Sequence, residues 1–168
     1  MTEVYVAAGS NVEPAQNLRL ALAELALRFP GMRRSRAYRN RAVGFEGEDF
    51  INLVVGFDTE LPIPEVIRQL QEVEALCGRE RQAPKWAPRA MDLDILLYGD
   101  TVLDQPGLVL PRPDLLRRAY MLGPMAELAP ALRHPTQERS MGELWASFDR
   151  AAHPMQEVEI GAGPQGGQ

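Results

Sequence analysis

Two aspartates separated by one residue, Asp92 and Asp94, are the residues of this sequence whose types and spacing most clearly suit chemistry. They begin an apolar run, and on a β-strand residues i and i+2 face the same side, so both carboxylates project from one face. Their Cα atoms would lie about 6–7 Å apart, and at an effective dielectric of about 20 such anions repel by roughly 2–3 kcal/mol. A Mg²⁺ ion would reverse that repulsion, because it binds one or two carboxylates together with waters and phosphate oxygens. A solvated strand face is the alternative, and the pair alone leaves both open.

The segment that precedes these aspartates is rich in cations: it carries Arg79, Arg81, Lys85 and Arg89. A basic loop that leads into a dicarboxylate strand suits a magnesium-bound nucleotide, because the acids hold the metal and the arginines neutralise the remaining phosphate charge. A solvated loop balanced by nearby acids explains the same residues equally well. The sequence contains neither a P-loop motif nor a dinucleotide-binding glycine motif, so a nucleotide would need another scaffold.

Three further residues could hold a flat heterocycle. Trp86 lies in the basic loop and Phe50 begins a strand, so the two rings could stack on either side of a ligand. Asn52 would share a strand face with Phe50 and could hydrogen-bond the edge of that ligand. Core packing is the alternative for Phe50. His134 and His153 belong to no motif, and we expect both on the surface.

The composition excludes several classes of protein. The 168 residues fit one domain, and 45% hydrophobic with 24% charged residues excludes a wholly disordered chain. A net charge of −5 argues against a nucleic-acid partner. The only cysteine, Cys77, excludes an internal disulfide, and the sequence shows neither a signal peptide nor an apolar run long enough to span a membrane. We therefore expect a cytoplasmic protein with no membrane partner.

The hydrophobic pattern predicts a βαββαβ order of elements. The expected strands are residues 4–8, 33–38, 50–58 and 92–98, with a further short strand at 108–110. A first helix begins at Pro14 and ends before Gly31, and a second ends at Gly78. In the strand at 92–98, Leu93, Ile95 and Leu97 share the face opposite the aspartates. This order predicts an α+β fold with helices on one face of an antiparallel sheet.

The remaining segments are predicted to be loops, one more helix and a tail. Residues 40–49 contain two glycines and lack periodicity, so we expect a mobile loop there. Residues 79–91 are predicted to form a long polar loop, which contains Pro84 and Pro88. Ser140 and Glu143 have the spacing of a capping box for a last helix that contains Leu144, Trp145 and Phe148. We expect residues 1–160 to form one domain, and the glycine-rich residues 161–168 to be a disordered tail.

The residues from Lys85 to Leu96 resemble a family signature. The run Lys-Trp-Ala-Pro-Arg-Ala-Met-Asp-Leu-Asp-Ile-Leu fits the pattern basic, any, small, Pro, Arg, any, any, Asp, apolar, Asp, apolar, apolar of the 6-hydroxymethyl-7,8-dihydropterin pyrophosphokinase family. The runs at residues 8–11, 38–39, 50–52, 71–74 and 78–79 are also similar to that family. The resemblance extends over residues 4–148, nearly everything but the tail.

This resemblance implies a ferredoxin-like α+β fold and a monomer that acts in folate biosynthesis. It implies transfer of pyrophosphate from ATP to the hydroxymethyl group of the reduced pterin, with release of AMP, beneath two loops that close and exclude water. It implies two Mg²⁺ ions bound by Asp92 and Asp94, and catalytic roles for Arg79, Arg89 and Asp94. The nucleotide-binding residues that it implies are Gln71, Glu74, Arg79, Arg81, Arg89, Arg112 and Arg118. The substrate-binding residues that it implies are Asn40, Val43, Phe50, Asn52, Trp86 and Tyr120.

Several positions depart from the common family pattern. Arg112 and Pro113 stand where a histidine and an aromatic residue are common, Phe50 where tyrosine is, Arg41 where proline is, and Gln82 where a basic residue is. An arginine can still contact phosphate, but it cannot act as a neutral imidazole or as a proton donor near neutral pH. Two alternatives stay open. One is a magnesium–nucleotide transferase that acts on another small alcohol, and the other is a degenerate, non-catalytic module that binds the pterin or the nucleotide.

Overall fold

The computed structural model describes residues 1–41, 47–78 and 91–161. Within these ranges, six strands form one sheet in the order β5–β1–β4–β3–β8, with β2 also paired to β4, and β6 and β7 form a separate hairpin. The strands are β1 (Thr2–Ser10), β2 (Arg33–Arg34), β3 (Ala37–Asn40), β4 (Phe50–Thr59), β5 (Asp92–Tyr98), β6 (Leu103–Gln105), β7 (Leu108–Leu110) and β8 (Gln156–Val158). The helices are α1 (Pro14–Arg28), α2 (Ile63–Leu76), the 3-10 helix η1 (Pro113–Leu116), α3 (Ala119–Leu128) and α4 (Met141–Ala146).

The order of elements confirms the predicted βαββαβ core. Neighbouring strands of the sheet run antiparallel, and β1 lies between β5 and β4. Helix α1 connects β1 to β2 and β3, and α2 connects β4 to β5. The single strand expected at 33–38 is instead two strands, β2 and β3, which both pair with β4. The strand expected at 108–110 is present as β7.

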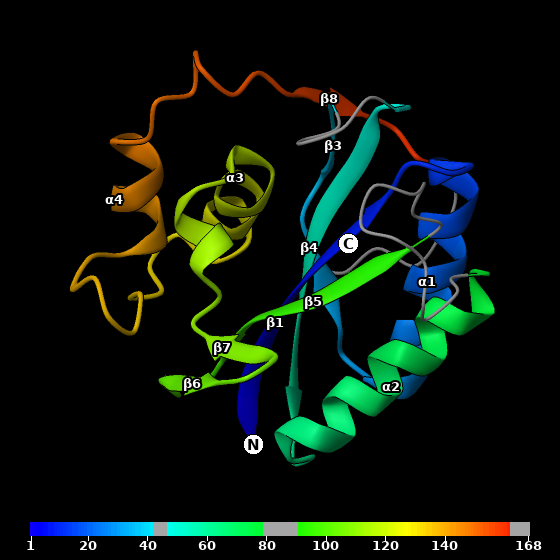
Figure 1. Cartoon of the computed structure of the whole chain (residues 1–168), viewed down its shortest axis with the longest axis horizontal. Coiled ribbons are helices and arrows are strands. Elements are labelled where there is room, and N and C mark those ends of the chain that lie inside the picture. The colour runs from blue at the N-terminus through cyan, green and yellow to red at the C-terminus, as the bar shows by residue number, and fades with distance from the viewer. Residues whose placement is uncertain (42–46, 79–90, 162–168) are drawn as a thin grey trace.

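One face of the sheet packs against α1 and α2 (Figure 1). Helix α1 begins at Pro14, as predicted, because a first helical residue needs no N–H donor. Phe29, which follows α1, stacks on Phe57 of β4 with 3.9 Å between the ring centroids. The buried aliphatic residues of this layer include Leu18, Leu22, Leu25, Leu53, Val55, Val66, Leu70 and Val73.

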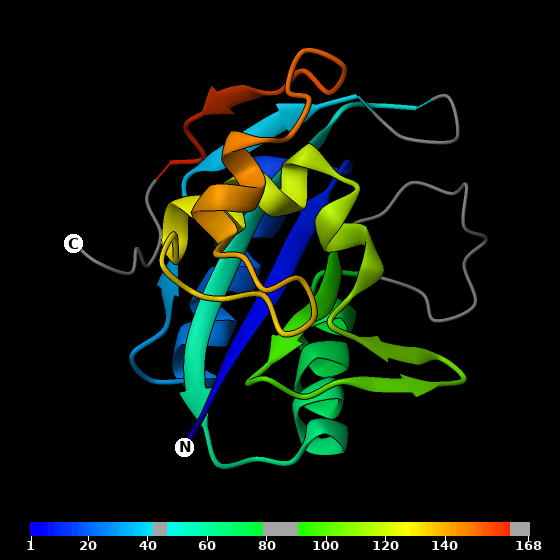
Figure 2. The same cartoon turned by 90° about the vertical axis from the view of Figure 1, so that its left-hand side faces the viewer.

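The opposite face packs against α3 and α4, which Figure 2 shows in front of the sheet. The prediction of helices on one face is therefore wrong on this point. Strands β1 and β4 are buried on both faces, so each reads as a continuous apolar run that does not reveal the second helical layer. The buried residues of this layer include Tyr5, Ala7, Val54, Leu96, Leu97, Met121, Leu122, Met125 and Met141.

Strand β5 departs from regular alternation. Val6 pairs with Ile95 but Tyr5 pairs with Leu97, so the register shifts at Leu96. Such a bulge places an extra residue in one strand and changes which face the next residue occupies. Ile95 shares the face of Leu93, as predicted, and packs toward α1 and α2, whereas Leu96 and Leu97 both pack toward α3 and α4. The predicted face of Leu97 is therefore wrong.

The C-terminal part confirms one sequence prediction and corrects another. The capping box is present: the Glu143 N–H donates to Ser140 Oγ at 3.1 Å, and the Ser140 N–H donates to Glu143 Oε1 at 2.9 Å. Helix α4 ends at Ala146, so Phe148 lies beyond it. Strand β8, which was not predicted, pairs with β3. Residues 162–168 of the expected tail lie outside the described residues.

His134 is buried, although the sequence predicted a surface position. Its side chain is 3% exposed, and its Nδ1 accepts a hydrogen bond from the Thr136 N–H at 3.1 Å. Burial lowers the pKa of this imidazole. His153 is exposed, as predicted. Across the described ranges, no helix is both long and apolar enough to cross a membrane.

Candidate active site

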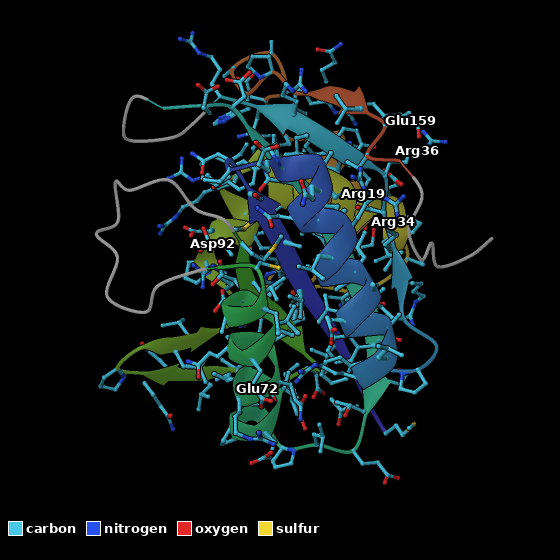
Figure 3. The ribbon with its side chains drawn as sticks, turned by 90° about the vertical axis from the view of Figure 1, so that its right-hand side faces the viewer. Arg19, Arg34, Arg36, Glu72, Asp92 and Glu159 are labelled. Carbon is cyan, nitrogen blue, oxygen red and sulfur yellow. The ribbon has the colours of Figure 1, made fainter. Side chains whose placement is uncertain are left out.

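Asp92 and Asp94 lie at the beginning of β5, opposite Gly9 and Ala7 of β1. In Figure 3, Asp92 lies just beyond α2, where the chain enters the sheet. Both aspartates are half-buried. Since Leu93 between them packs toward α1 and α2, the two carboxylates share the other face, as their spacing predicts.

Glu74 connects this end of β5 to α2. The Leu93 N–H donates to Glu74 Oε2 at 2.8 Å. Because β5 is an edge of the sheet, a carboxylate on α2 can occupy a position that a further strand would otherwise take. Glu74 thereby fixes the backbone between the two aspartates.

Gly9 forms the floor between Asp92 and Asn52. It pairs with Asp92 on one side and with Asn52 on the other, so the three residues form one row across the sheet. Neighbouring strands lie about 4.8 Å apart, which places Asn52 and Asp92 about 10 Å from each other across a residue without a side chain. A Cβ atom on Gly9 would lie 2.3 Å from Asn52 Oδ1, a distance that Cβ atoms do not tolerate. Gly9 was not predicted to belong to the site, although a glycine inside a strand often marks close approach of a ligand.

Asn52 is buried, at 7% exposure, and its Nδ2 donates to Asn40 Oδ1. Asn40 Nδ2 in turn donates to the Arg41 carbonyl at 3.0 Å. Phe50 pairs with Asn40 across β3 and β4, and it is half-buried on the same face as Asn52. The structure therefore brings together three residues that the resemblance assigns to substrate binding.

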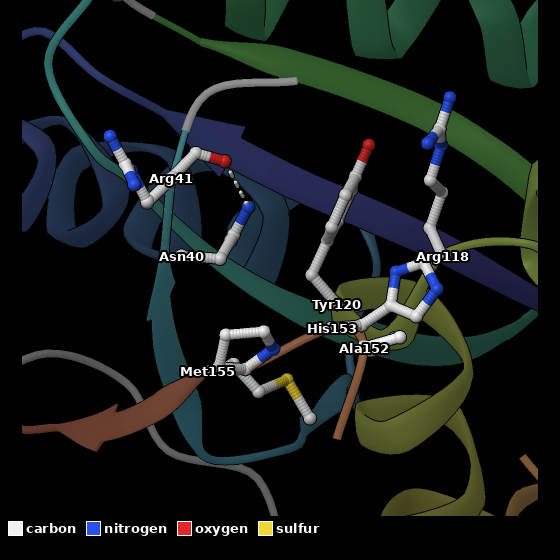
Figure 4. A pocket seen from close by; sticks show the side chains of 9 residues that line it. Asn40, Arg41, Arg118, Tyr120, Ala152, His153 and Met155 are labelled. Carbon is white, nitrogen blue, oxygen red and sulfur yellow. Dashed lines mark hydrogen bonds between the residues drawn. The ribbon is translucent and has the colours of Figure 1, made fainter. Parts of the chain in front are cut away.

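A pocket of about 330 Å³ lies between the end of β3, the start of α3 and the C-terminal segment, and we call it the Tyr120 pocket. In Figure 4, Tyr120 and Arg118 point the same way, and Asn40 and Arg41 lie opposite them. Burial raises the pKa of the Tyr120 phenol, so the ring is a neutral, largely apolar wall. His153 also lines this pocket, together with Ala152, Pro154 and Met155. No sequence pattern indicates these residues, because the pairing of β8 with β3 brings them here from far along the chain.

A second pocket, of about 220 Å³, lies between α2, β5 and β7, and we call it the Asp94 pocket. It combines Gln71 and Glu74 of α2 with Asp94 of β5 and with Arg112. All four were predicted to contact nucleotide or metal, and they come from three separate parts of the sequence. Apolar walls complete the pocket, made by Ile67, Leu70, Leu93, Ile95 and Leu108.

Arg112 is the cation of the Asp94 pocket among the described residues. Its Nη1 lies 3.8 Å from Asp94 Oδ1, and its Nη2 lies 3.6 Å from Asp114 Oδ2. The Arg112 N–H donates to the Leu96 carbonyl at 2.9 Å, which anchors its backbone beside β5. The departure from the common family pattern therefore lies directly against a predicted metal ligand.

The two aspartates suit a magnesium ion. In the part of the chain that the structure describes, no group of three or more His, Cys, Asp or Glu side chains could enclose a metal ion. Two carboxylates on an open strand end match Mg²⁺, which keeps waters and takes phosphate oxygens as its other ligands. Five predicted site residues lie outside the described residues: Val43, Arg79, Arg81, Trp86 and Arg89.

Comparison with known proteins decides the family. The model of the 7,8-dihydro-6-hydroxymethylpterin-pyrophosphokinase (HPPK) family matches residues 5–130, well over half of the chain. This chain belongs to the HPPK family. The matched part of the HPPK domain contains Asn52, Asp92, Asp94, Arg112 and Tyr120, whereas α4 and β8 lie beyond it.

Bacterial members of the HPPK family are similar over most of their length. The 2-amino-4-hydroxy-6-hydroxymethyldihydropteridine pyrophosphokinase of Pseudomonas aeruginosa is 40% identical over 149 residues, which cover 86% of this chain and 90% of that protein. The protein of the same name from Synechocystis sp. is 38% identical over 151 residues, which cover 88% of this chain and 76% of that protein.

Solved structures confirm the fold of this HPPK chain. An HPPK-DHPS crystallised with substrates superposes with a TM-score of 0.71 at 11% identity, over 89% of this chain and 44% of that chain. An HPPK-DHPS of Plasmodium falciparum superposes with a TM-score of 0.70 at 11% identity, over 86% of this chain and 45% of that chain. This chain thus spans less than half the length of these larger proteins, and at such low identity the likeness concerns the fold alone.

Proposed function

We propose that this chain transfers pyrophosphate from ATP to the hydroxymethyl group of 6-hydroxymethyl-7,8-dihydropterin, releasing AMP, in folate biosynthesis. Membership of the HPPK family carries this proposal. The row of Asn52, Gly9 and Asp92 across the sheet supports it, because it offers a polar edge for a heterocycle, a flat floor and a metal-binding carboxylate in one line. The reaction forms a bond from the substrate hydroxyl oxygen to the β-phosphorus and breaks the bond between that phosphorus and the oxygen that leaves with AMP.

Asn52, Phe50 and Tyr120 bind the pterin in this proposal. The Asn52 amide hydrogen-bonds the edge of the ring, and its own bond to Asn40 holds that amide in a fixed orientation. Phe50 and Tyr120 provide faces for stacking, and Gly9 leaves room for the ring above β1. Val43 and Trp86 complete the site in the proposal, from segments outside the described residues.

Asp92 and Asp94 hold two Mg²⁺ ions in this proposal. When bound with ATP, these ions would neutralise and orient the phosphate oxygens. The carboxylates are held on a strand whose position is fixed by pairing with β1 and by the Glu74 hydrogen bond, so they need little rearrangement. Asp94 is also our candidate to accept the proton of the substrate hydroxyl.

The Asp94 pocket receives the nucleotide in this proposal. Gln71 and Glu74 offer hydrogen-bonding groups beside apolar walls that suit a base or ribose, and Arg112 offers a guanidinium for phosphate. Arg118 lies at the start of α3, in the neighbouring Tyr120 pocket, and adds a second cation. Arg79, Arg81 and Arg89, which lie outside the described residues, would neutralise the developing phosphate charge in this proposal.

We also propose that the protein works as a monomer in the cytoplasm. The monomer is what the resemblance to the family implies. The single cysteine, Cys77, is a buried free thiol, which suits a reducing compartment.

The first experiment incubates the protein with MgATP and 6-hydroxymethyl-7,8-dihydropterin and separates the nucleotides. We expect AMP that depends on the pterin, and its loss in Asp92→Ala but not in Asp104→Ala, which removes an exposed aspartate from the β6–β7 hairpin. If the protein binds the pterin without releasing AMP, it is a non-catalytic binding module. If it does not bind the pterin at all, the transferase acts on another alcohol.

A further inference from the structure

Arg112 forms a loose ion pair with a carboxylate to which the proposed function assigns Mg²⁺. The 3.8 Å from Nη1 to Asp94 Oδ1 is longer than a hydrogen bond, and the two side chains are 35% and 36% exposed. Such a pair in partly solvated surroundings is attractive but weak. The guanidinium can therefore leave Asp94 at little cost.

The same side chain has other contacts that permit this movement. Its Nη2 lies 3.6 Å from Asp114 Oδ2, so the guanidinium remains near one acid when it leaves the other. The backbone hydrogen bond to the Leu96 carbonyl fixes the Cα atom, which limits the movement to the side chain. Among the described residues, the buried Arg112 Nε has no hydrogen-bond partner, so one N–H donor of the guanidinium is not used in this arrangement.

We propose that Arg112 occupies the place of the divalent cation at Asp94 until the magnesium–nucleotide arrives, and then turns from Asp94 to the phosphates. Two cations cannot share one carboxylate without repulsion, so Arg112 opposes the binding of free metal. A phosphate chain changes the balance, because it brings several negative charges that the guanidinium binds as a planar fork. Arg112 thus makes the metal enter with the nucleotide rather than before it.

This inference rests on the proposed function, because it takes Asp94 as a metal ligand. It goes beyond that function by assigning one residue opposite effects on two binding equilibria. A residue that merely contacts the nucleotide would leave the affinity for free metal unchanged. A residue that merely positions Asp94 would strengthen the binding of both the free metal and the metal–nucleotide complex.

The test measures Mn²⁺ affinity by electron paramagnetic resonance, first with the metal alone and then with the α,β-methylene analogue of ATP, which cannot release AMP. We expect Arg112→Gln to bind Mn²⁺ alone about three- to tenfold more tightly than the unchanged protein. We expect it to bind the Mn²⁺–analogue complex about tenfold more weakly, since a charge-assisted contact to phosphate is lost. Arg112→Lys keeps the charge and should retain weak binding of the free metal.

Two controls separate this inference from the function on which it rests. Arg117→Gln removes the same charge from an exposed position of the same segment, and we expect no change in Mn²⁺ affinity. If Arg112→Gln matches Arg117→Gln, or binds both ligands more weakly, the proposal is overturned while the metal site stands. If Asp94→Asn binds Mn²⁺ as tightly as the unchanged protein does, the metal assignment itself fails, and the proposal with it. Thermal unfolding of each variant verifies that the fold is intact.

Discussion

The two faces of the central sheet carry the same strands but serve different purposes. Toward α1 and α2, the side chains of β1, β4 and β5 are aliphatic or aromatic along nearly their whole length. Toward α3 and α4, only part of the face is apolar. Beyond Tyr5, Ala7 and Val54 it changes to Gly9, Asn52 and the two aspartates.

Because of this difference, one face of the sheet stabilises the fold and the other face presents the residues proposed to carry out the chemistry. The face toward α1 and α2 buries large side chains, whose packing stabilises the fold and holds the strands in register. The other face can then present small and polar residues at one end of the strands without losing the fold. Because the carboxylates and the amide belong to paired strands, the packing of one face fixes their positions on the other.

The largest expected effect is the loss of AMP release when a carboxylate of the polar face is neutralised. Asp94→Asn keeps the shape of the side chain but removes its charge, so we expect kcat for AMP release to fall by about 10²–10³-fold. The thermal midpoint should change little, because Asp94 is only half-buried. Asp104→Asn, on the exposed hairpin, is the matched control. Turnover within threefold of the unchanged enzyme would remove Asp94 from the catalytic machinery.

A second variant acts on the apolar face. Leu25 of α1 is fully buried, so Leu25→Ala should lower the free energy of unfolding by about 2–5 kcal/mol in urea titrations. KM for both substrates should stay unchanged below the unfolding transition. Leu27→Ala, on the same helix but 77% exposed, should shift stability by less than about 0.5 kcal/mol. A raised KM in Leu25→Ala would show that the two faces are coupled.

A third variant acts on the floor of the site. The added methyl group of Gly9→Ala would collide with Asn52 Oδ1 and force the amide away from Asn40. We expect KM for the pterin to rise by about tenfold, with a smaller effect on KM for MgATP. If the effect passes through Asn52, then Gly9→Ala should add little when combined with Asn52→Ala. Additive effects would indicate that Gly9 acts on the ligand directly.

The smallest expected effect concerns pH and the layer of α3 and α4. Since burial lowers the pKa of His134, the unfolded chain binds a proton more readily than the folded protein does. Stability should be complete above the ordinary histidine pKa of about 6.5 and should fall as the pH drops below it. Thermal midpoints at pH 7.5 and 5.5 should therefore differ less in His134→Gln than in the unchanged protein. An equal difference in both would show that other groups cause the acid sensitivity, and His153→Gln is the surface control.

The sequence predicted the parts of the fold that depend on local pattern. The βαββαβ order, the start of α1 at Pro14 and the capping box of Ser140 and Glu143 follow from periodicity and from capping chemistry, and the structure confirms them. The second helical layer, the bulge at Leu96 and the burial of His134 were not predicted. Each depends on contacts between distant segments, which a single sequence does not specify.

The candidate site also combines features that the sequence predicted with features that it did not predict. The paired aspartates and their shared face follow from a period of two along a strand, and the family signature adds the roles of the residues around them. Their assignment to metal, nucleotide and pterin stays a prediction for the experiments above. No sequence pattern indicates that Arg112 lies against Asp94, or that Gly9 forms the floor beside Asn52.

By itself, the sequence determined the types of chemical group, their spacing along each strand and the family signature, because local geometry converts spacing directly into a shared face. Only the tertiary structure decided which of these groups meet. The pairing of β1 with β4 and β5 aligns Asn52, Gly9 and Asp92, and the connection after β7 brings Arg112 to Asp94. These contacts join residues far apart in the chain, and their free energy comes from the packing of the whole domain rather than from any local pattern.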